Sequence, residues 1–437
     1  MARPQRNRPL LERVGGTAVR GPLGRRIPGA GGAIVQVVPP SIDVAAERAA
    51  TPGCTTVVHL NSAGAALATT ATLDTVIEHL ELEASRGGYE AAAAVKDRIA
   101  AVVASAAALI GADPSEVAIT GSDTEGWTKA LWGFALGGGL PAGWRILVDR
   151  QSYDSHYMGL LQVCEVTGAT IAVVPGLADG TIDLAALADE LATGDVGLVS
   201  ATHVGTHRGL VNPVEEVGQL CRTAGVPFFL DACQSIGQLP VDVGRIGCAV
   251  ATGTGRKWLR GPRGTGLLYV RADVVESLRP PGIDGASAQW DDPTHLRLRP
   301  GIARFVPFES PVAMHLGLGT AVDHVLALGI DAIADQIGFV AEHLRSELAG
   351  VDRVSVHDGG ARRSGIVTFT VDGLDPSVVK AAASAAGVNV SVTDAGAARL
   401  DMGGTRPESV VRASPHYINT DDECGRLVEV VSAATKH

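Results

Sequence analysis

A lysine and an aspartate stand at positions where their side chains could do chemistry. Lys257 lies in the glycine-rich turn Gly253-Thr-Gly-Arg-Lys-Trp258, between two apolar runs. Asp231 directly follows the apolar run Val226-Pro-Phe-Phe-Leu230, so we expect it at the carboxyl end of a strand. A lysine in a loop is usually a solvated charge, and an aspartate after a strand is often a helix N-cap, here over Ser235. Taken singly, neither residue indicates a function.

The two residues together match the needs of pyridoxal phosphate (PLP). The aldehyde of this cofactor forms an imine with a lysine amine. Its pyridine nitrogen needs an anionic partner, because only the protonated ring withdraws electrons strongly. Lys257 can supply the amine and Asp231 the anion. We therefore interpret both as the catalytic residues of a PLP enzyme.

A third segment could hold the phosphate of the cofactor. Thr120-Gly-Ser-Asp-Thr-Glu125 leads from an apolar run into a helical one. A helix N-terminus with free backbone N–H groups and small hydroxyl side chains is a common phosphate site. The same pattern also fits an ordinary helix cap, and both interpretations stay open at this point. Thr254, three residues before Lys257, offers another hydroxyl near the same end of the cofactor.

With these residues the sequence resembles the class V aminotransferase superfamily. Asp231-Ala-Cys-Gln-Ser235 is followed, about 26 residues later, by Lys257 in a Thr-Gly-x-Lys-x-x-x-Gly-Pro-x-Gly-x-Gly context. The resemblance covers about residues 57 to 435. It includes Leu60-Asn-Ser-Ala-Gly64, Gly87-Gly-Tyr-Glu-Ala91 and Val411-Arg-Ala-Ser-Pro-His-Tyr-Ile-Asn-Thr420. The superfamily contains cysteine desulfurases, selenocysteine lyases, isopenicillin N epimerase and carbon–sulfur lyases of the ergothioneine pathway, and the second motif is similar to the lyase and epimerase branch.

The resemblance implies a role for each matching residue. Around the cofactor these are Ser122, Asp123, Thr124 and Thr254 at the phosphate, Tyr153 stacked on the ring, Asp231 at the ring nitrogen, Gln234 at the phenolic oxygen, and Lys257 as the imine-forming residue and general base. Around the substrate they are Arg412, which would grip the carboxylate, with Asn61 and Ser62 from the substrate-side loop. His203 and Thr206 would line the cofactor pocket, although a histidine packed beside the sheet fits His203 equally well. Ser310 would reach the phosphate of the neighbouring subunit in a homodimer.

Three departures from the family pattern bear on the reaction. Arg256 stands where a histidine commonly precedes the lysine, and Thr206 stands where an asparagine is expected; neither blocks PLP binding. A desulfurase also needs a mobile cysteine near the carboxylate-binding arginine to accept sulfur. The segment from Arg412 to Tyr417 has no cysteine, and Cys424 is expected to be a buried small residue at the start of the last helix.

PLP stabilises negative charge at the substrate Cα, and the outcome then depends on which group leaves. The motifs favour loss of a sulfur substituent from Cβ. We therefore expect a carbon–sulfur lyase that acts on cysteine or an S-substituted cysteine and yields pyruvate, ammonia and a sulfur product. An epimerase of the isopenicillin N epimerase type and a class V aminotransferase are the alternatives. A PLP-fold binding module without catalysis is disfavoured, because Lys257 and Asp231 are both present.

The elements that must position these residues repeat one theme from about residue 115 to 275. A short β-rich apolar run and a polar turn precede a longer segment of helical period, which is typical of an α/β domain with its ligand site at the carboxyl ends of parallel strands. The resemblance implies PLP fold type I, with a mostly parallel seven-stranded sheet. The expected strands are 116–120, 145–149, 170–174, 197–201, 227–230, 248–251 and 266–270, with helices such as 124–136 and 213–224 between them.

After about residue 310 the pattern changes to a long helical stretch over 312–348, followed by strands at 365–371, 388–392 and 410–414. We expect three parts. Residues 1–50 would form a flexible tail, 51–310 a large PLP-binding domain whose N-terminal segment contributes to the small domain, and 311–437 a small α+β domain. The tail interpretation is preferred to a transit peptide because prolines interrupt its arginine-rich sequence.

The composition limits the partners. The chain has 36 basic and 47 acidic residues, and its net charge of −11 argues against nucleic acid or an anionic membrane as a partner. Charges such as Lys96, Asp97 and Arg98 interrupt the apolar runs, so we expect no membrane span. Six scattered cysteines lack the close pairs of a zinc site or a disulfide framework, so we expect no metal and a reducing cytoplasm. The expected partner is a small molecule, an amino-acid substrate.

Overall fold

Seven strands form one sheet in the order β2-β8-β7-β6-β5-β3-β4. Strands β3 to β7 run parallel, and β8 is antiparallel to both of its neighbours. This confirms the predicted α/β fold with a mostly parallel seven-stranded sheet. The strands are β2 (Val117–Thr120), β3 (Arg145–Val148), β4 (Thr170–Val173), β5 (Val196–Thr202), β6 (Phe228–Asp231), β7 (Val250–Thr254) and β8 (Gly266–Val270). The computed structural model describes residues 42–403 and 407–436, which belong to one compact unit, Pro40–His437.

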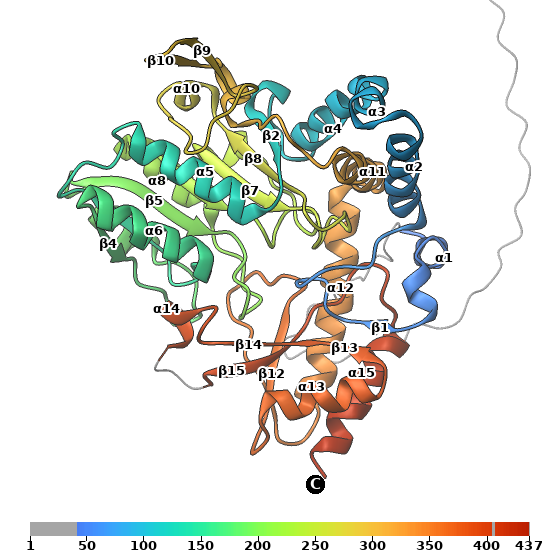
Figure 1. Ribbon diagram of the computed structural model, residues 1–437. Coiled ribbons are helices and arrows are strands. Elements are labelled where there is room, and N and C mark those ends of the chain that lie inside the picture. The colour runs from blue at the N-terminus through green and yellow to red at the C-terminus, as the bar shows by residue number, and fades with distance from the viewer. Residues whose placement is uncertain (1–41, 404–406, 437) are drawn as a thin grey trace, which may run out of the picture. The chain divides into compact units, whose positions relative to one another are not determined.

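Helices cover both faces of this sheet, because neighbouring strand residues point to opposite sides. Phe229 packs in one hydrophobic cluster with residues of α5 (Asp123–Leu136) and α6 (Asp154–Thr167), and Figure 1 shows both helices in front of the sheet. Phe228 packs in a second cluster with residues of α7 (Leu184–Leu191) and α8 (Val214–Ala224). Since both faces are covered, the central strands are near-continuous apolar runs rather than alternating ones.

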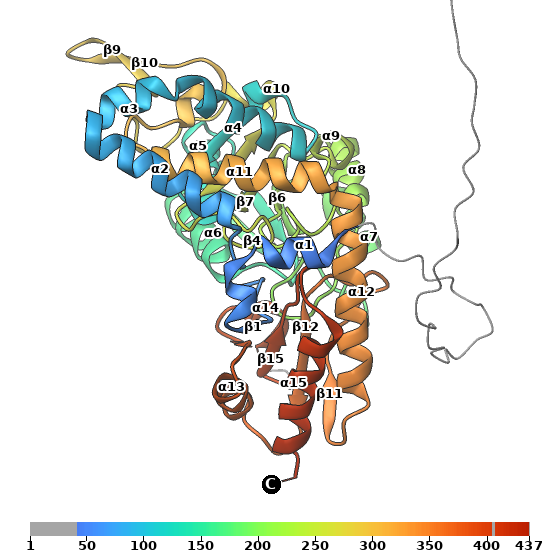
Figure 2. The ribbon, with the colours of Figure 1, turned by 90° about the vertical axis from the view of Figure 1, so that its right-hand side faces the viewer.

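The helical stretch expected over 312–348 is two helices. α11 (Val312–Leu328) and α12 (Ile330–Ala349) meet at Gly329, whose φ of 83° only glycine adopts readily, and they are bent by 84°. α11 packs against α2 (Thr70–Arg86) and α4 (Lys96–Leu109), and α12 continues beside the second sheet (Figures 1 and 2). Among the described residues no single helix is long and apolar enough to cross a membrane. Only α11 and α12 taken together have the length and apolar composition of a membrane span, and they are sharply bent.

A smaller antiparallel sheet has the order β11-β12-β15-β14. Its strands are β11 (Val354–Val356), β12 (Val367–Val371), β14 (Ser391–Asp394) and β15 (Ser409–Ala413), and it packs with α13 (Pro376–Ala385) and α15 (Asp421–Ala434). β1 (Val58–His59) pairs in parallel with β13 (Val388–Asn389), so a segment near the N-terminus of the described chain contacts the C-terminal region. A domain boundary at residue 310 stays a prediction.

The sequence-based boundaries need one correction near the N-terminus. Residues 44–50 were expected in the tail, but Val44–Ala49 forms α1, capped by Asp43, which accepts a hydrogen bond from the Ala46 amide. Residues 1–41 lie outside the described part of the chain. The remaining elements are η1 (Pro52–Thr55), α3 (Gly88–Ala94), η2 (Pro114–Glu116), α9 (Val243–Ile246), α10 (Ala272–Val275), β9 (Ala288–Asp292), β10 (His295–Leu298), η3 (Gly301–Phe305) and α14 (Arg399–Met402).

Candidate active site

Lys257 and Asp231 reach the same buried place. Asp231 is the last residue of β6 and lies in register with Thr202 of β5 and Thr252 of β7. One Asp231 oxygen accepts the Cys233 amide at 2.9 Å, and the Lys257 Nζ lies 3.1 Å from the Cys233 Sγ. Both candidate catalytic side chains therefore adjoin Cys233, at the carboxyl end of the parallel strands.

The loop that carries Lys257 is fixed by Arg260. The Arg260 amide donates to the Lys257 carbonyl at 2.9 Å, and Arg260 adopts a left-handed backbone with φ of 61°. Its fully buried guanidinium donates to the Leu67 carbonyl, the Tyr417 hydroxyl and the Thr51 hydroxyl. A non-glycine residue in this conformation persists only when its surroundings hold it there. Hydrogen bonds of Arg260 thus connect the lysine loop to residues near the N-terminus and near the C-terminus of the described chain.

His156 of α6 bridges two buried carboxylates. Its Nε2 lies 2.9 Å from Asp123 Oδ2, and its Nδ1 lies 3.3 Å from Asp231 Oδ2. The imidazole also stacks on Trp127, with ring centroids 4.2 Å apart and planes 11° apart. We refer to Asp123, His156 and Asp231 as the carboxylate–histidine relay. A doubly protonated ring can contact both acids at once, one through each nitrogen.

The electrostatics of the relay agree with this geometry. Burial by itself lowers the pKa of His156, but the charges of Asp123 and Asp231 outweigh it and raise that pKa to about 10. Burial also raises the pKa of Asp123, whereas His156 lowers it, and the net pKa lies below its ordinary value. Donor atoms of Asp123, Asp231 and Cys233 lie within 4.8 Å of one another, in the manner of metal ligands. His156 already places a cation between the two carboxylates.

The expected phosphate segment begins α5, but its residues divide into two sets. Ser122 caps the helix by accepting the Glu125 amide at 3.1 Å, and Thr124 is exposed. The Asp123 side chain instead turns into the carboxylate–histidine relay. The prediction that this side chain holds the phosphate is therefore wrong, since a carboxylate repels a phosphate and here has a cationic partner. Only its backbone N–H stays available at the helix N-terminus, where first-turn amides lack an intrahelical acceptor.

Gly266 allows this helix start to pack directly on β8. A Cβ added at Gly266 would lie 2.5 Å from the Ser122 carbonyl carbon and 2.9 Å from the Asp123 nitrogen. Any side chain would therefore displace the first turn of α5. Thr254, the last residue of β7, is buried, and its hydroxyl donates to the Thr265 carbonyl at 3.2 Å, just before Gly266.

Gln234 connects the substrate-side loop to the lysine loop. Its Nε2 donates to the Ala63 carbonyl at 3.1 Å, and its Oε1 accepts from Trp258 Nε1 at 2.9 Å. One N–H of the amide group remains for the expected bond to the phenolic oxygen of the cofactor. The loop itself is anchored by Ser414, whose carbonyl accepts the Ser62 amide and whose hydroxyl accepts the Ala63 amide.

Arg412 projects from β15 toward the same region. Its Nη1 donates to the Thr206 hydroxyl at 2.5 Å, and its Nε donates to the Ser391 hydroxyl at 3.1 Å. Burial lowers the pKa of Arg412 to about 10, which leaves the side chain cationic at neutral pH. Thr206 thus lies at the site, but its contact is with Arg412. Asn61, beside this strand through its bridge to Ser414, has a buried Oδ1 without a partner in the described residues.

Two further residues of the predicted site lie at its margins. Tyr153 precedes α6, is partly buried, and meets His156 edge-on with ring centroids 6.3 Å apart. The charges of Arg256 and Arg412 act on its pKa, which burial raises. Ser310 lies between η3 and α11 and is partly exposed beside the exposed Phe308. Its predicted reach into a neighbouring subunit stays a prediction.

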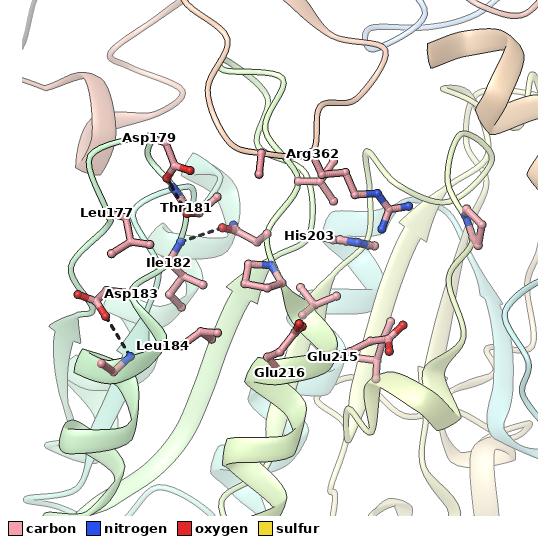
Figure 3. A pocket seen from close by; sticks show the side chains of 18 of the residues that line it. Leu177, Asp179, Thr181, Ile182, Asp183, Leu184, His203, Glu215, Glu216 and Arg362 are labelled. Atoms are coloured by element: carbon pink, nitrogen blue, oxygen red, sulfur yellow. Dashed lines mark hydrogen bonds between the residues drawn. The ribbon is translucent and has the colours of Figure 1, made fainter. Parts of the chain in front are cut away.

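The side chain of His203 lies away from Lys257 and Asp231. Its backbone amide donates to the Asp231 carbonyl at 2.9 Å, but its side chain lines a separate cavity with residues of α7 and α8. Figure 3 shows the imidazole in that cavity beside Arg362. The prediction that His203 lines the cofactor pocket is therefore wrong for its side chain, because the chain bends after β5 and turns the imidazole to the α8 side.

Sequence reasoning missed the contributions of His156, Cys233 and Arg260. His156 occupies a buried position within α6, and its sequence pattern does not distinguish it from a core residue. Cys233 stands at the variable position of the Asp-Ala-x-Gln-Ser motif. Arg260 is one of several basic residues in the glycine-rich loop, with Arg256 and Arg263, and the sequence does not distinguish it from them.

The residues present fit PLP. The Lys257 amine lies beside Cys233, whose amide contacts the Asp231 carboxylate, and that carboxylate lies where it could pair with the ring nitrogen. Free first-turn amides of α5 stand ready for a phosphate. The buried Asn61 Oδ1 without a partner and the Arg412 guanidinium offer polar contacts on the substrate side. All the groups that this chemistry requires therefore converge on one site.

Comparisons with known proteins agree. The family model "Aminotransferase class-V" matches residues 58–427. A probable hercynylcysteine sulfoxide lyase of Mycobacterium tuberculosis is 33% identical over 384 residues, covering 86% of this chain and 90% of the relative. A probable cysteine desulfurase of Methanothermobacter thermautotrophicus is 27% identical over 354 residues, covering 79% and 86%. The chain belongs to the class V aminotransferase family and is a PLP-dependent enzyme.

Solved structures confirm the fold. The apo cysteine desulfurase of Thermococcus onnurineus NA1 superposes with a TM-score of 0.84 at 22% identity, covering 91% of this chain and 99% of the other. A mutant of C-DES, with glycine covalently linked to its PLP cofactor, superposes with a TM-score of 0.78 at 23% identity, covering 88% and 98%. PLP fold type I is thereby shown, as predicted.

Proposed function

We propose that this enzyme is a carbon–sulfur lyase that acts by β-elimination on cysteine or an S-substituted cysteine and releases pyruvate, ammonia and a sulfur product. The observation that carries the proposal is the convergence of Lys257, Asp231 and Cys233 at one buried place, with Arg412 on the substrate side. The names of the relatives support cleavage of a carbon–sulfur bond, since they are a sulfoxide lyase and cysteine desulfurases.

When bound, PLP supplies the electron sink for the bond that breaks at the substrate Cα. Lys257 would remove the Cα proton, since its amine is buried beside the end of β6. The electrons of that bond then expel the Cβ substituent, and the sulfur leaves with the electron pair of the Cβ–S bond. The Lys257 ammonium can return its proton to the departing sulfur or to the product.

Arg412 would set the geometry of the proton transfer. Thr206 and Ser391 hold the guanidinium in place. Its remaining N–H groups can bind the substrate carboxylate, and a carboxylate fixed in this way orients the Cα–H bond toward Lys257. Arg412 is buried, so little water competes for it.

His156 would act as a positioning residue. Its contact with Asp231 would hold that carboxylate in place for the ring nitrogen of PLP. Asp123 balances the second nitrogen of the imidazole, so the relay carries two negative charges and one positive charge. We propose that the relay, rather than Asp231 alone, sets the charge at this end of the cofactor.

The cysteines favour elimination over transfer of sulfur to the enzyme. The segment from Arg412 to Thr420 has none. Cys424 is fully buried in α15, and burial raises its pKa to about 12. Burial also raises the pKa of Cys233, and a protonated thiol is a poor sulfur acceptor. The sulfur is therefore expected to leave with the product.

A pyruvate assay tests this function. Purified PLP-loaded enzyme is given cysteine and a set of S-alkyl cysteines, and pyruvate is quantified together with the sulfide released from cysteine or the alkyl thiol released from its conjugates, with K257A as the blank. Equal amounts of both products from wild type support the lyase. Inversion at Cα without pyruvate would establish the epimerase, and amino transfer to a 2-oxo acid would establish the aminotransferase; either result overturns the proposal.

We also propose a cytoplasmic homodimer. α2 carries an exposed apolar stripe of Leu73, Ile77 and Leu80, and exposed Tyr89 lies edge-on to exposed Phe308, with ring centroids 6.4 Å apart. A second subunit would cover such a surface. All six cysteines are free, which suits a reducing compartment. Light scattering at several protein concentrations tests the dimer, and a monomer at all of them refutes it.

A further inference from the structure

A second cavity lies between the turn at residues 177–185 and the start of α8. Its volume is about 770 Å³, and its lining includes His203 and Arg362 but not Lys257, Asp231 or Arg412. Figure 3 shows that its walls come from the loop before α7, the first turn of α8 and the segment that carries Arg362. The volume suits a small organic molecule. The chemistry described above leaves this cavity without a role.

His203 is a buried polar group that faces this cavity. Its side chain is 4% exposed, and its Nδ1 has no hydrogen-bond partner in the part of the chain that the structure describes. Its backbone is fixed on both sides, because its amide donates to Asp231 and its carbonyl accepts from Asn212. A buried nitrogen without a partner is unfavourable unless a ligand or water supplies one.

Arg362 stands beside His203 on a loop held by backbone hydrogen bonds. The Arg362 carbonyl accepts the Val211 amide at 3.0 Å, and the nearby Gly360 amide donates to the Asp179 carbonyl at 3.1 Å. Its guanidinium makes no ion pair or side-chain hydrogen bond within residues 42–403 and 407–436, and its charge acts on His203. The Arg362 guanidinium, with its free N–H donors, and the His203 imidazole beside it therefore favour the binding of an anion.

The first turn of α8 adds to this positive region. Pro213, at the N-cap, provides no side-chain cap, and the amides of Glu215 and Glu216 have no intrahelical acceptor. Arg362, His203 and a helix N-terminus therefore surround one part of the cavity. A carboxylate, with its planar pair of oxygens, can bind to an arginine fork and an imidazole together.

Acidic residues on the other walls of the cavity determine which charge the rest of the ligand can carry. Asp179, Asp183 and Asp242 each accept backbone N–H groups of their own turns. Glu215 pairs with Arg245 at 3.0 Å. Among the described residues Glu216 forms no ion pair, so it is the acid available to a ligand. Apolar Ile182, Val214 and Ile246 line the space as well.

We propose that this cavity binds a small zwitterion, with its carboxylate at Arg362 and His203, its cationic nitrogen at Glu216, and a hydrocarbon segment between them. The site is separate from the one that cleaves substrate, and its occupancy does not depend on the proposed reaction. Binding of a second molecule here would allow an amino acid or similar compound to be sensed away from Lys257.

Three probes of equal chain length test the proposal by calorimetry on the full-length, PLP-loaded protein: 6-aminohexanoate, hexanoate and hexylamine. We expect 6-aminohexanoate to bind at least about fivefold more tightly than either singly charged probe. R362Q should weaken it by about tenfold or more, while R86Q, a change at an exposed arginine on α2, should not. E216Q should reduce 6-aminohexanoate to the affinity of hexanoate, with E81Q as its control.

An R412Q protein separates this cavity from the amino-acid site. Binding of 6-aminohexanoate that survives R412Q and is lost in R362Q supports the proposal. Binding that is lost in R412Q and survives R362Q places the probe at the other site and overturns it. Tighter binding of hexylamine than of 6-aminohexanoate, or no heat from any probe at millimolar concentration, also overturns it.

Discussion

Replacement of His156 by phenylalanine removes the cation between two buried carboxylates and keeps an aromatic ring beside Trp127. The wild-type imidazole lies 2.9 Å from Asp123 and 3.3 Å from Asp231, and all three side chains are almost fully buried. Phenylalanine can maintain the stacking but donates no hydrogen bond. The perturbation therefore isolates the charge and the polar contacts of the carboxylate–histidine relay.

The magnitude follows from the distances. Unit charges 3.3 Å apart attract by about 5 kcal/mol at an effective dielectric constant of about 20, and desolvation opposes part of this. Removal of one partner from a buried ion pair typically costs about 3–5 kcal/mol. We expect H156F to lower the free energy of unfolding by about 3 kcal/mol. One carboxylate would then take up a proton, and we expect the dissociation constant of PLP to rise by about tenfold or more, since tenfold corresponds to about 1.4 kcal/mol.

Urea unfolding of the apo form and titration with PLP, followed by absorbance, measure the two effects separately. H295F is the matched control, because His295 also lies 2.9 Å from an aspartate, Asp292, but at the exposed surface. An exposed pair contributes about 0–1 kcal/mol. If H156F unfolds like H295F and binds PLP as wild type does, the relay has no electrostatic role and the reasoning fails. If H156F loses stability but its PLP affinity is unchanged, His156 stabilises the fold and has no role in PLP binding.

Three further predictions test other parts of the site. The two carboxylates raise the pKa of His156 from 6.5 to about 10, so the stabilisation from its charge is complete below pH 6.5 and is lost as the pH rises toward 10. The difference in unfolding free energy between wild type and H156F should therefore shrink between pH 6.5 and pH 10. A difference that stays constant over this interval would contradict the assignment. G266A places a Cβ 2.5 Å from Ser122 and should cost about 1–3 kcal/mol and weaken PLP binding, whereas G285A, with open space around it, should do neither. R412K should raise the KM for the substrate by about tenfold or more with a smaller change in kcat, because lysine cannot form the bidentate fork; an unchanged KM would exclude Arg412 from carboxylate binding.

The sequence predicted the large sheet well for a physical reason. Strands buried on both faces are continuous apolar runs, so Val226 to Leu230 and Gly266 to Val270 stand out from the polar turns around them. The same rule located Asp231, because an acid directly after such a run must lie at the end of a strand. The break at Gly329 was not predicted, since a single glycine inside a long apolar helical pattern does not by itself indicate a bend of 84°.

The site was predicted less completely than the fold. Motif spacing singled out Lys257, Asp231 and Arg412, and their role in the site stays a prediction; motif spacing also cannot show which way a side chain turns. Asp123 lies in the expected helix start and faces the relay instead of the phosphate; its negative charge was the available signal against a phosphate contact. His203 directly follows β5, and only the bend after that strand decides which side of the sheet its imidazole occupies.

The most direct test of the account is to locate the lysine that holds the cofactor. The PLP-loaded enzyme is reduced with borohydride, digested, and analysed by mass spectrometry. The chain has five lysines, at positions 96, 129, 257, 380 and 436, and Lys257 is the buried one among them. We predict that the pyridoxyl group is found on the Lys257 peptide and is lost in K257A. Label on any of the other four lysines, or equal label in K257A, would contradict the account.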